Sequence, residues 1–328
     1  MEQTHITMRY RRFGRTDWKV SEIGYGMWGM GGWTGSDDDE SRRSLDRAVE
    51  LGCNFFDTAY AYGMGRSEKL LGEALKRHPS TKLYTATKVP PKNLKWPGRA
   101  ETPIAEVFPA SYIVEMTERS LTNLGTSAVD LQQLHVWSDA WADDEGWQRA
   151  AEDLKRQKLI NAFGISVNRW EPANVIKALR TGLVDAVQVV YNVFDQSPED
   201  ELFPVCRELD IAIIARVPFD EGSLTGTLTR ESRWPEGDWR NIYFTPANLA
   251  ETLERVERLK DVTPASMDLP ELALRFILSE PAVSTVIPGM RKVGHVERNI
   301  AASDGEPLPP TARDRLREHR WDRTHVIP

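Results

Sequence analysis

From Val20 onward, short runs of β-branched and other apolar residues alternate with longer stretches in which apolar residues recur every three or four positions. The short runs predict strands and the longer stretches predict amphipathic helices. Eight strands are expected, at residues 22–26, 54–57, 83–88, 131–135, 162–166, 186–191, 211–216 and 284–287. Eight helices are expected, at residues 40–51, 67–77, 111–124, 147–156, 172–181, 202–209, 248–259 and 270–279.

This alternation is typical of parallel β/α units, and eight of them favour a closed (β/α)8 TIM barrel over an open doubly wound sheet. The expectation is one α/β domain over residues 1–328, with a small hairpin before Val20 and an extra amphipathic stretch near residues 313–320. Three long connections, at residues 90–110, 136–146 and 217–247, follow strands. Barrel enzymes keep their sites at that end of the strands, so these loops should shape the pocket.

The composition limits the kinds of molecule that the chain is expected to bind. The chain has 328 residues and a formal net charge of −7, and it has no block rich in lysine and arginine, so a nucleic-acid partner is not expected. It has neither a signal-peptide pattern nor a run of about 18 apolar residues, which predicts no membrane span and a cytosolic location. Cys53 and Cys206 lie in apolar runs and are expected to be buried without a redox role.

Candidate chemistry lies at the ends of three predicted strands. Asp57, Lys88 and His135 end successive strands, and Tyr62 follows Asp57 in a loop. A phenol has a pKa near ~10, so it needs a nearby cation to give up its proton at neutral pH, and a carboxylate would hold that cation in place. The set suits reduction of a carbonyl whose oxygen becomes an alkoxide, with His135 hydrogen-bonding that oxygen. The alternative is a purely structural ion pair between Asp57 and Lys88. No metal site is predicted.

At this point the chain resembles the aldo-keto reductase family. The resemblance covers nearly the whole chain, and it is carried by Asn54-Phe55-Phe56-Asp57-Thr58-Ala59, Tyr62-Gly63, Thr87-Lys88-Val89, Leu134-His135, Gly164-Ile165-Ser166 and Val286-Ile287-Pro288-Gly289. It implies a barrel that binds a nicotinamide cofactor without a glycine-rich fingerprint. It also implies a catalytic tetrad of Asp57, Tyr62, Lys88 and His135 with Tyr62 as the general acid. Tyr60 is the competing phenol, but Tyr62 is the one followed by glycine, as in the family's motif.

The resemblance also implies a cofactor site. Ser166, Asn168 and Gln188 correspond to positions that bind the nicotinamide carboxamide, although this chain inserts Val167 between the serine and the asparagine. Arg216 stands where many members carry an aromatic residue that stacks on the nicotinamide, and a guanidinium plane can stack too.

The remaining cofactor candidates are small or basic. The run Gly222, Ser223 and Leu224 has free backbone N–H groups that could receive a pyrophosphate. By resemblance, Arg291, His295 and Asn299 form the adenosine-phosphate site, and Arg291 would accept a 2′-phosphate, which favours NADP(H) over NAD(H). The set of expected cofactor-binding residues is completed by Gly26, Trp28 and Gly289.

Eleven tryptophans are many for this length. Trp28, Trp33, Trp96 and Trp137 follow strands, so they are expected to line an apolar substrate pocket, although tryptophan is more often core or interface. The predicted function is NADP-dependent reduction of an aldehyde or ketone. Two alternatives remain: an aldolase that forms a Schiff base on Lys88, and a cofactor-binding regulatory subunit with little turnover.

Overall fold

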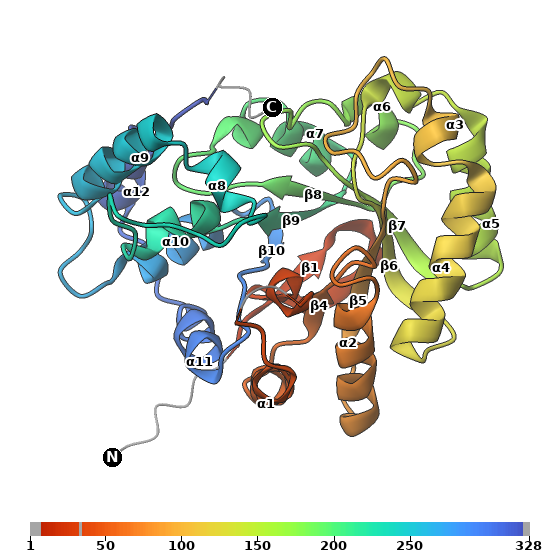
Figure 1. Cartoon of the computed structure of the whole chain (residues 1–328), viewed down its shortest axis with the longest axis horizontal. Coiled ribbons are helices and arrows are strands. Elements are labelled where there is room, and N and C mark those ends of the chain that lie inside the picture. Colours follow the sequence, from red (N-terminus) through yellow and green to blue (C-terminus); the bar gives the residue numbers. More distant parts are fainter. Residues whose placement is uncertain (1–7, 33–34, 324–328) are drawn as a thin grey trace.

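The computed structural model describes residues 8–32 and 35–323 of the chain. Its centre is a barrel of eight parallel strands, each paired with the next along the chain (Figure 1). The strands are β3 (Tyr25–Gly26), β4 (Phe55–Asp57), β5 (Tyr84–Val89), β6 (Val129–Leu134), β7 (Ile160–Ser166), β8 (Ala186–Val190), β9 (Ala212–Arg216) and β10 (Val283–Val286). Parallel bridges from Ile23 to Val286 and from Gly26 to Gly289 join the first strand to the last. The predicted (β/α)8 barrel is confirmed.

The predicted hairpin lies across the amino-terminal ends of the strands, which we call the amino mouth. Strands β1 (Tyr10–Phe13) and β2 (Trp18–Ser21) pair antiparallel around the 3-10 helix η1 (Gly14–Thr16). Phe13 and Val20 are fully buried and pack with Phe55, Ala86 and Leu131 from inside the barrel. The hairpin therefore closes the amino mouth and leaves the opposite end, the carboxyl mouth, for chemistry.

Helices surround the strands (Figure 1). The longer ones are α1 (Asp38–Glu50), α2 (Arg66–Arg77), α4 (Ala110–Leu124), α5 (Glu145–Arg156), α7 (Leu202–Glu208), α9 (Pro246–Leu259), α10 (Leu269–Leu278), α11 (Val293–Ala301) and α12 (Pro310–Arg317). Each buries one face; in α1, for example, Leu45 and Ala48 are buried and Asp37 caps the first turn by accepting from Glu40 N at 2.9 Å. Among the described residues, no helix is both long and apolar enough to cross a membrane.

One predicted helix is wrong. Residues 172–181 form turns and only the four-residue α6 (Ile176–Leu179). The side chain of Asn174 accepts a hydrogen bond from Asp139 N at 2.8 Å and donates to Glu171 Oε2 at 2.9 Å. Such local side-chain bonds compete with helical ones, so the chain here folds against the neighbouring loop instead.

The long connections contain short elements of their own. They include α3 (Ile104–Val107) after β5, η3 (Asp139–Trp141) after β6, and η5 (Asp220–Thr225) and α8 (Arg240–Tyr243) after β9. The predicted C-terminal stretch overlaps α12. Both α12 and the chain after it pack on the loop after β8: Gln196 Nε2 donates to Leu316 O in α12 at 2.9 Å, and Trp321 N donates to Phe194 O at 2.9 Å. Chain segments more than 100 residues apart thus meet at the carboxyl mouth.

Candidate active site

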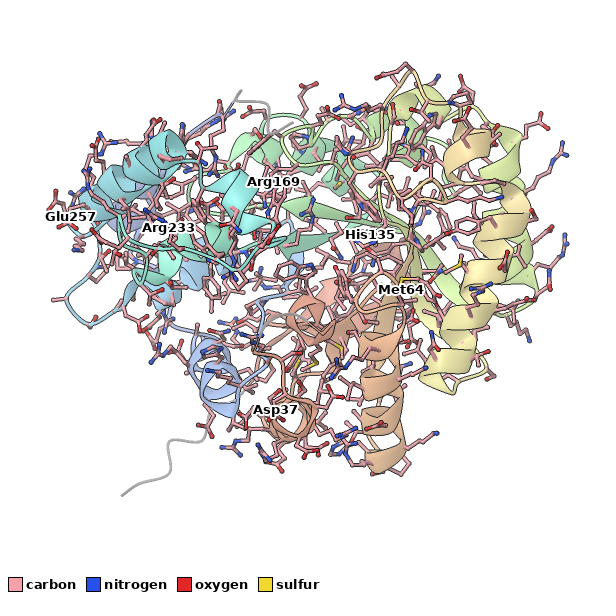
Figure 2. All side chains as sticks on the ribbon, in the orientation of Figure 1. Asp37, Met64, His135, Arg169, Arg233 and Glu257 are labelled. Atoms are coloured by element: carbon pink, nitrogen blue, oxygen red, sulfur yellow. The ribbon has the colours of Figure 1, made fainter. Side chains whose placement is uncertain are left out.

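The four predicted catalytic residues meet at the carboxyl mouth. Asp57 is the last residue of β4, Lys88 is the penultimate residue of β5, and His135 directly follows β6. Since these strands are parallel neighbours, their ends lie side by side, and the loop after β4 brings Tyr62 over them. Figure 2 shows His135 near the ends of the central strands.

Lys88 is the hub of this group. Its side chain is fully buried, and its ammonium donates to Asp57 Oδ1 at 2.5 Å, to Thr58 O at 2.7 Å and to the Tyr62 hydroxyl at 3.4 Å. An ammonium has three N–H groups, so every donor of this buried cation has an acceptor. The charge of Lys88 is thereby held beside the Tyr62 oxygen.

Two glutamine side chains hold Asp57 from the other side. Asp57 Oδ2 accepts from Gln188 Nε2 at 2.7 Å and from Gln133 Nε2 at 3.2 Å. Gln188 was predicted to bind the cofactor; in the structure its amide nitrogen donates to the Asp57 carboxylate. Gln133 was missed, although three polar residues, Asp130, Gln132 and Gln133, in the fully buried strand β6 are themselves a signal of a buried polar network.

Burial determines the protonation state of the Tyr62 phenol. It raises the pKa of the Tyr62 phenol, Asp57 raises it further, and the positive charges of Lys88 and Arg216 oppose the rise without overcoming it. The expected influence of Lys88 is present, but burial outweighs it, because a phenolate loses its hydration when it is removed from water. Tyr62 is therefore protonated at neutral pH and can act as a proton donor.

His135 is neutral for the same reason. Burial lowers the pKa of its imidazole well below 6.5, and the charges of Lys88 and Arg216 lower it further. Its ring meets the Tyr62 ring edge-on, with 5.7 Å between centroids, and within the described part of the chain its buried Nδ1 atom has no hydrogen-bond partner. A neutral imidazole carries one N–H and one lone pair, so His135 can donate one hydrogen bond to a substrate oxygen.

Tyr60 lies on the other side of its loop. It packs partly buried against the core and raises the pKa of Arg119 on α4, which places its hydroxyl away from Lys88. Of the two candidate phenols, the structure brings Tyr62 to the ammonium.

The nicotinamide candidates lie on β7, β8 and β9 or directly after β7. Ser166 ends β7 and pairs with Gln188, the middle residue of β8. Asn168 differs: its side chain accepts from Gly98 N at 3.1 Å and donates to Gly98 O at 2.8 Å. The oxygen and the nitrogen of the Asn168 amide therefore both bond to Gly98 and hold the loop after β5 in place.

Arg216 ends β9 as a cation without a carboxylate partner among the described residues. Its Nη2 donates to Val167 O at 2.9 Å, and its buried Nε has no partner. Burial and the neighbouring charge of Arg169 lower its pKa to about 10. It still carries its charge at neutral pH, and it contributes to the positive potential around Tyr62 and His135.

The pyrophosphate candidates lie in η5. Gly222 has φ of 105°, a conformation that favours glycine, and a Cβ added there would meet nothing within 4 Å. The Ser223 hydroxyl donates to Asp220 Oδ2 at 2.7 Å, and Leu224 is buried. Gly289 also faces open space, whereas a Cβ on Gly26 would lie 2.5 Å from Ile287 O, so Gly26 is needed for strand closure.

The adenosine-phosphate candidates cluster around α11. Arg291 passes beside Gly29 and Gly35, which follow β3, so it lies on the same side as Trp28. Asn299 is buried in α11. His295 lies near the surface, and partial loss of hydration together with the charges of Lys292, Arg298 and Arg291 lowers the pKa of its imidazole. The positive charge expected of a phosphate site is therefore present.

The tryptophans divide between rim and core. Trp28 and Trp96 are 39% and 47% exposed, and the Trp96 ring meets His135 edge-on with 5.9 Å between centroids. Trp137 is fully buried against Trp141 and Trp147, so its predicted place in a substrate pocket is wrong. An indole can follow a strand and still turn into the core. Trp33 lies outside the described residues.

Comparison with known proteins gives one consistent result. Residues 22–320 match the family model described as "Aldo/keto reductase family". The chain is 31% identical to the uncharacterized oxidoreductase YqkF of Bacillus subtilis over 95% of this chain and 96% of that protein. It is 27% identical to the NADH-specific methylglyoxal reductase of Escherichia coli, over 88% and 91%. The structure of aldo-keto reductase AKR11C1 from Bacillus halodurans, in its holo form, superposes with a TM-score of 0.76 at 28% identity, over 97% and 98%.

Proposed function

Because the chain belongs to the aldo/keto reductase family and is an oxidoreductase, we propose that it reduces aldehydes or ketones to alcohols, with NADPH as hydride donor and Tyr62 as general acid. The observation that carries the proposal is the buried Lys88 ammonium, which contacts both the Asp57 carboxylate and the Tyr62 hydroxyl. A structural ion pair alone would not need a phenol as the third partner.

Each of the four tetrad residues has a different role in protonating the carbonyl oxygen. When the nicotinamide cofactor is bound, it supplies the hydride that the carbonyl carbon accepts. The carbonyl oxygen then gains negative charge and takes the proton of the Tyr62 hydroxyl. Lys88 stabilises the phenolate left behind, Asp57 orients Lys88, and neutral His135 donates a hydrogen bond to the substrate oxygen.

The cofactor candidates fit a dinucleotide. Open space in front of Gly222 and Gly289 leaves room for phosphates beside the backbone, and the Arg216 guanidinium has an unpaired buried Nε. Ser166, Gln188 and Arg216 would hold the nicotinamide end, and Gly222, Ser223 and Leu224 the pyrophosphate. Arg291, with His295 and Asn299, would hold the adenosine phosphate, which is the reason to propose NADP(H).

The alternatives are less well supported. A Schiff-base aldolase needs an accessible, uncharged amine, whereas Lys88 is fully buried and all three of its N–H groups are bonded. A regulatory subunit without turnover would not require Tyr62, Lys88, Asp57 and His135 to be assembled. The expected cytosolic location and the single domain over residues 1–328 stay predictions.

The test is a titration followed by turnover. The purified protein is titrated with NADPH and with NADH by fluorescence, and cofactor oxidation is then followed by absorbance with aromatic, aliphatic and sugar aldehydes. We expect tighter binding of NADPH and turnover of at least one aldehyde class. Tight binding without turnover on any carbonyl would favour the regulatory subunit, and tighter NADH binding would overturn the role of Arg291.

A further inference from the structure

Arg323, near the C-terminal end, is buried against the loop that follows β9. Its side chain is 2% exposed, and Nη2 donates to Asp195 Oδ2 at 2.7 Å and to Asp220 Oδ1 at 2.9 Å. Nη1 donates to the Tyr243 hydroxyl, which in turn donates to Asp220. One guanidinium thus joins the loop after β8, the start of η5 and helix α8.

Asp220 connects Arg323 to the proposed pyrophosphate site. Its carboxylate is fully buried, with Oδ1 bound to Arg323 and Oδ2 accepting from the Ser223 hydroxyl. Burial alone would raise the pKa of Asp220, but the charge and hydrogen bond of Arg323, together with the hydrogen bonds from Tyr243 and Ser223, outweigh it and lower the pKa. Two hydrogen bonds therefore lead from the C-terminal segment to a residue proposed to meet phosphate.

The backbone between β9 and η5 has a conformation that needs support. Val217, Asp220 and Glu221 have φ of 56°, 44° and 55°, in the left-handed region that L-residues with a Cβ rarely adopt. A conformation of this kind persists only where surrounding contacts impose it. Arg323 holds Asp220, and Arg169 pairs with Glu221. Figure 2 shows Arg169 beside α8.

The segment that carries Arg323 is itself anchored. Two guanidiniums contact the Trp321 ring, with 4.3 Å from Arg255 and 4.6 Å from Arg323 to the ring centroid. Trp321 N also donates to Phe194 O at 2.9 Å. The position of Arg323 is therefore fixed, so its hydrogen bond can hold Asp220 in one conformation.

We propose that Arg323 is a positioning residue for the cofactor: it holds residues 217–226 in the conformation that receives the pyrophosphate and so slows dissociation of NADP(H). The inference rests on the proposed function, since it needs Ser223 and its neighbours to bind the pyrophosphate. Arg323 itself contacts no reacting group. Its influence should appear in cofactor release and leave the carbonyl site unaffected.

The experiment measures NADPH dissociation by stopped-flow fluorescence in the full-length protein. We expect Arg323→Met to speed dissociation by about tenfold or more, because an unclamped loop opens more often. Arg323→Lys, which keeps one charge, should give a smaller increase. The matched control is Arg320→Met, since Arg320 lies in the same segment but pairs with Asp200 and Asp322 and not with the loop after β9. The KM for the carbonyl should not change.

Folding is checked by circular dichroism and thermal unfolding. If folded Arg323→Met releases NADPH at the wild-type rate, the proposal is overturned. If Arg323→Met does not fold, Arg323→Lys and Tyr243→Phe decide: faster release in either supports the clamp, and wild-type rates in both overturn it. A wild-type protein that binds neither cofactor would overturn the proposed function as well, whereas normal binding with unchanged variants overturns the clamp alone.

Discussion

The two mouths of the barrel both bury charge, but they satisfy it differently. At the amino mouth, Asp185 accepts from Phe163 N at 2.9 Å and from Arg15 Nε at 2.9 Å, and it also pairs with Lys155. At the carboxyl mouth, Lys88 and Asp57 are equally well bonded, yet His135 Nδ1 and Arg216 Nε next to them are buried without partners. Unsatisfied polar atoms cost stability, so their presence indicates a site kept for a ligand.

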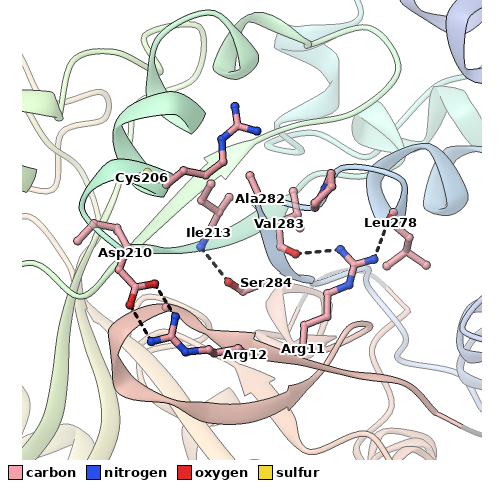
Figure 3. Close-up of a pocket in the computed structure, with 13 residues that line it drawn as sticks. Arg11, Arg12, Cys206, Asp210, Ile213, Leu278, Ala282, Val283 and Ser284 are labelled. Carbon is pink, nitrogen blue, oxygen red and sulfur yellow. Dashed lines mark hydrogen bonds and ion pairs between the residues drawn. The ribbon is translucent and has the colours of Figure 1, made fainter.

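A pocket at the amino mouth shows the same contrast. It measures about 550 Å³ and lies between the hairpin and the segments of β9 and β10, lined by Arg11, Arg12 and Ser284 among others (Figure 3). Arg11 donates to Glu22 and to the carbonyls of Leu278 and Val283, and Arg12 binds Asp210 through both of its terminal nitrogens. The pocket is larger than the space that a bound water needs. Arg11 and Arg12, however, already use their donors to hold the hairpin in place. Volume alone does not identify a functional end; the proposed site is distinguished by unpaired polar atoms that lie beside the tetrad.

The strongest test of the difference between the two mouths is Tyr62→Phe, with Tyr60→Phe as its matched control. Removing the proposed acid should lower kcat by roughly 10²–10⁴-fold while NADPH binding stays, because the ring remains and only the proton donor is lost. Tyr60→Phe should keep near-normal kcat. The measurement is steady-state turnover together with a fluorescence titration. Near-normal turnover in Tyr62→Phe would end the assignment.

A second test compares one lysine from each mouth. Lys88→Met leaves the carboxylate of Asp57 buried without its cation, so it should destabilise the fold by roughly 3–5 kcal/mol and also abolish most turnover. Lys82→Met removes a cation that is 59% exposed and pairs with Asp130, so it should cost about 0–1 kcal/mol and leave kcat unchanged. Urea unfolding and turnover are measured on both. Equal stability losses would contradict the difference in burial.

Asp185→Asn separates stability from activity. The change removes a charge shared by Arg15 and Lys155 at the amino mouth but keeps one oxygen that can accept, so we expect a loss of about 1–3 kcal/mol in unfolding free energy. Because the tetrad lies at the other end of the barrel, kcat/KM should equal the wild-type value below the unfolding transition. A large fall in kcat/KM would show that the two mouths are coupled.

The smallest expected effect is that of pH. Tyr62 has a raised pKa and stays protonated, and His135 has a pKa well below 6.5 and stays neutral, so kcat/KM for reduction should be flat between about pH 6 and 8. The rate should fall only at alkaline pH, where the Tyr62 phenol loses its proton. An inflection near pH 6.5 that disappears in His135→Gln would show that His135 titrates and acts as an acid.

Much of this site could be predicted from local patterns. Strand ends identified Asp57, Lys88 and His135, because parallel strands that alternate with helices bring their carboxyl ends to one mouth. Helix 172–181 failed because Asn174 bonds to Asp139, a partner in another loop that periodicity does not reveal. The prediction that Trp137 lines a substrate pocket failed because a position after a strand does not determine the direction in which a side chain points.

The sequence by itself predicted the barrel, the family and the four residues of the proposed tetrad, since these depend on periodicity and on short motifs. Only the tertiary structure decided the second set of partners: Gln133 and Gln188 on Asp57, Asn168 on Gly98, and Arg323 on Asp220. The physical reason is distance along the chain. The residues in these pairs are separated by 70 to 131 positions along the chain, and such contacts form only when closure of the barrel brings the strand ends and the C-terminal segment together.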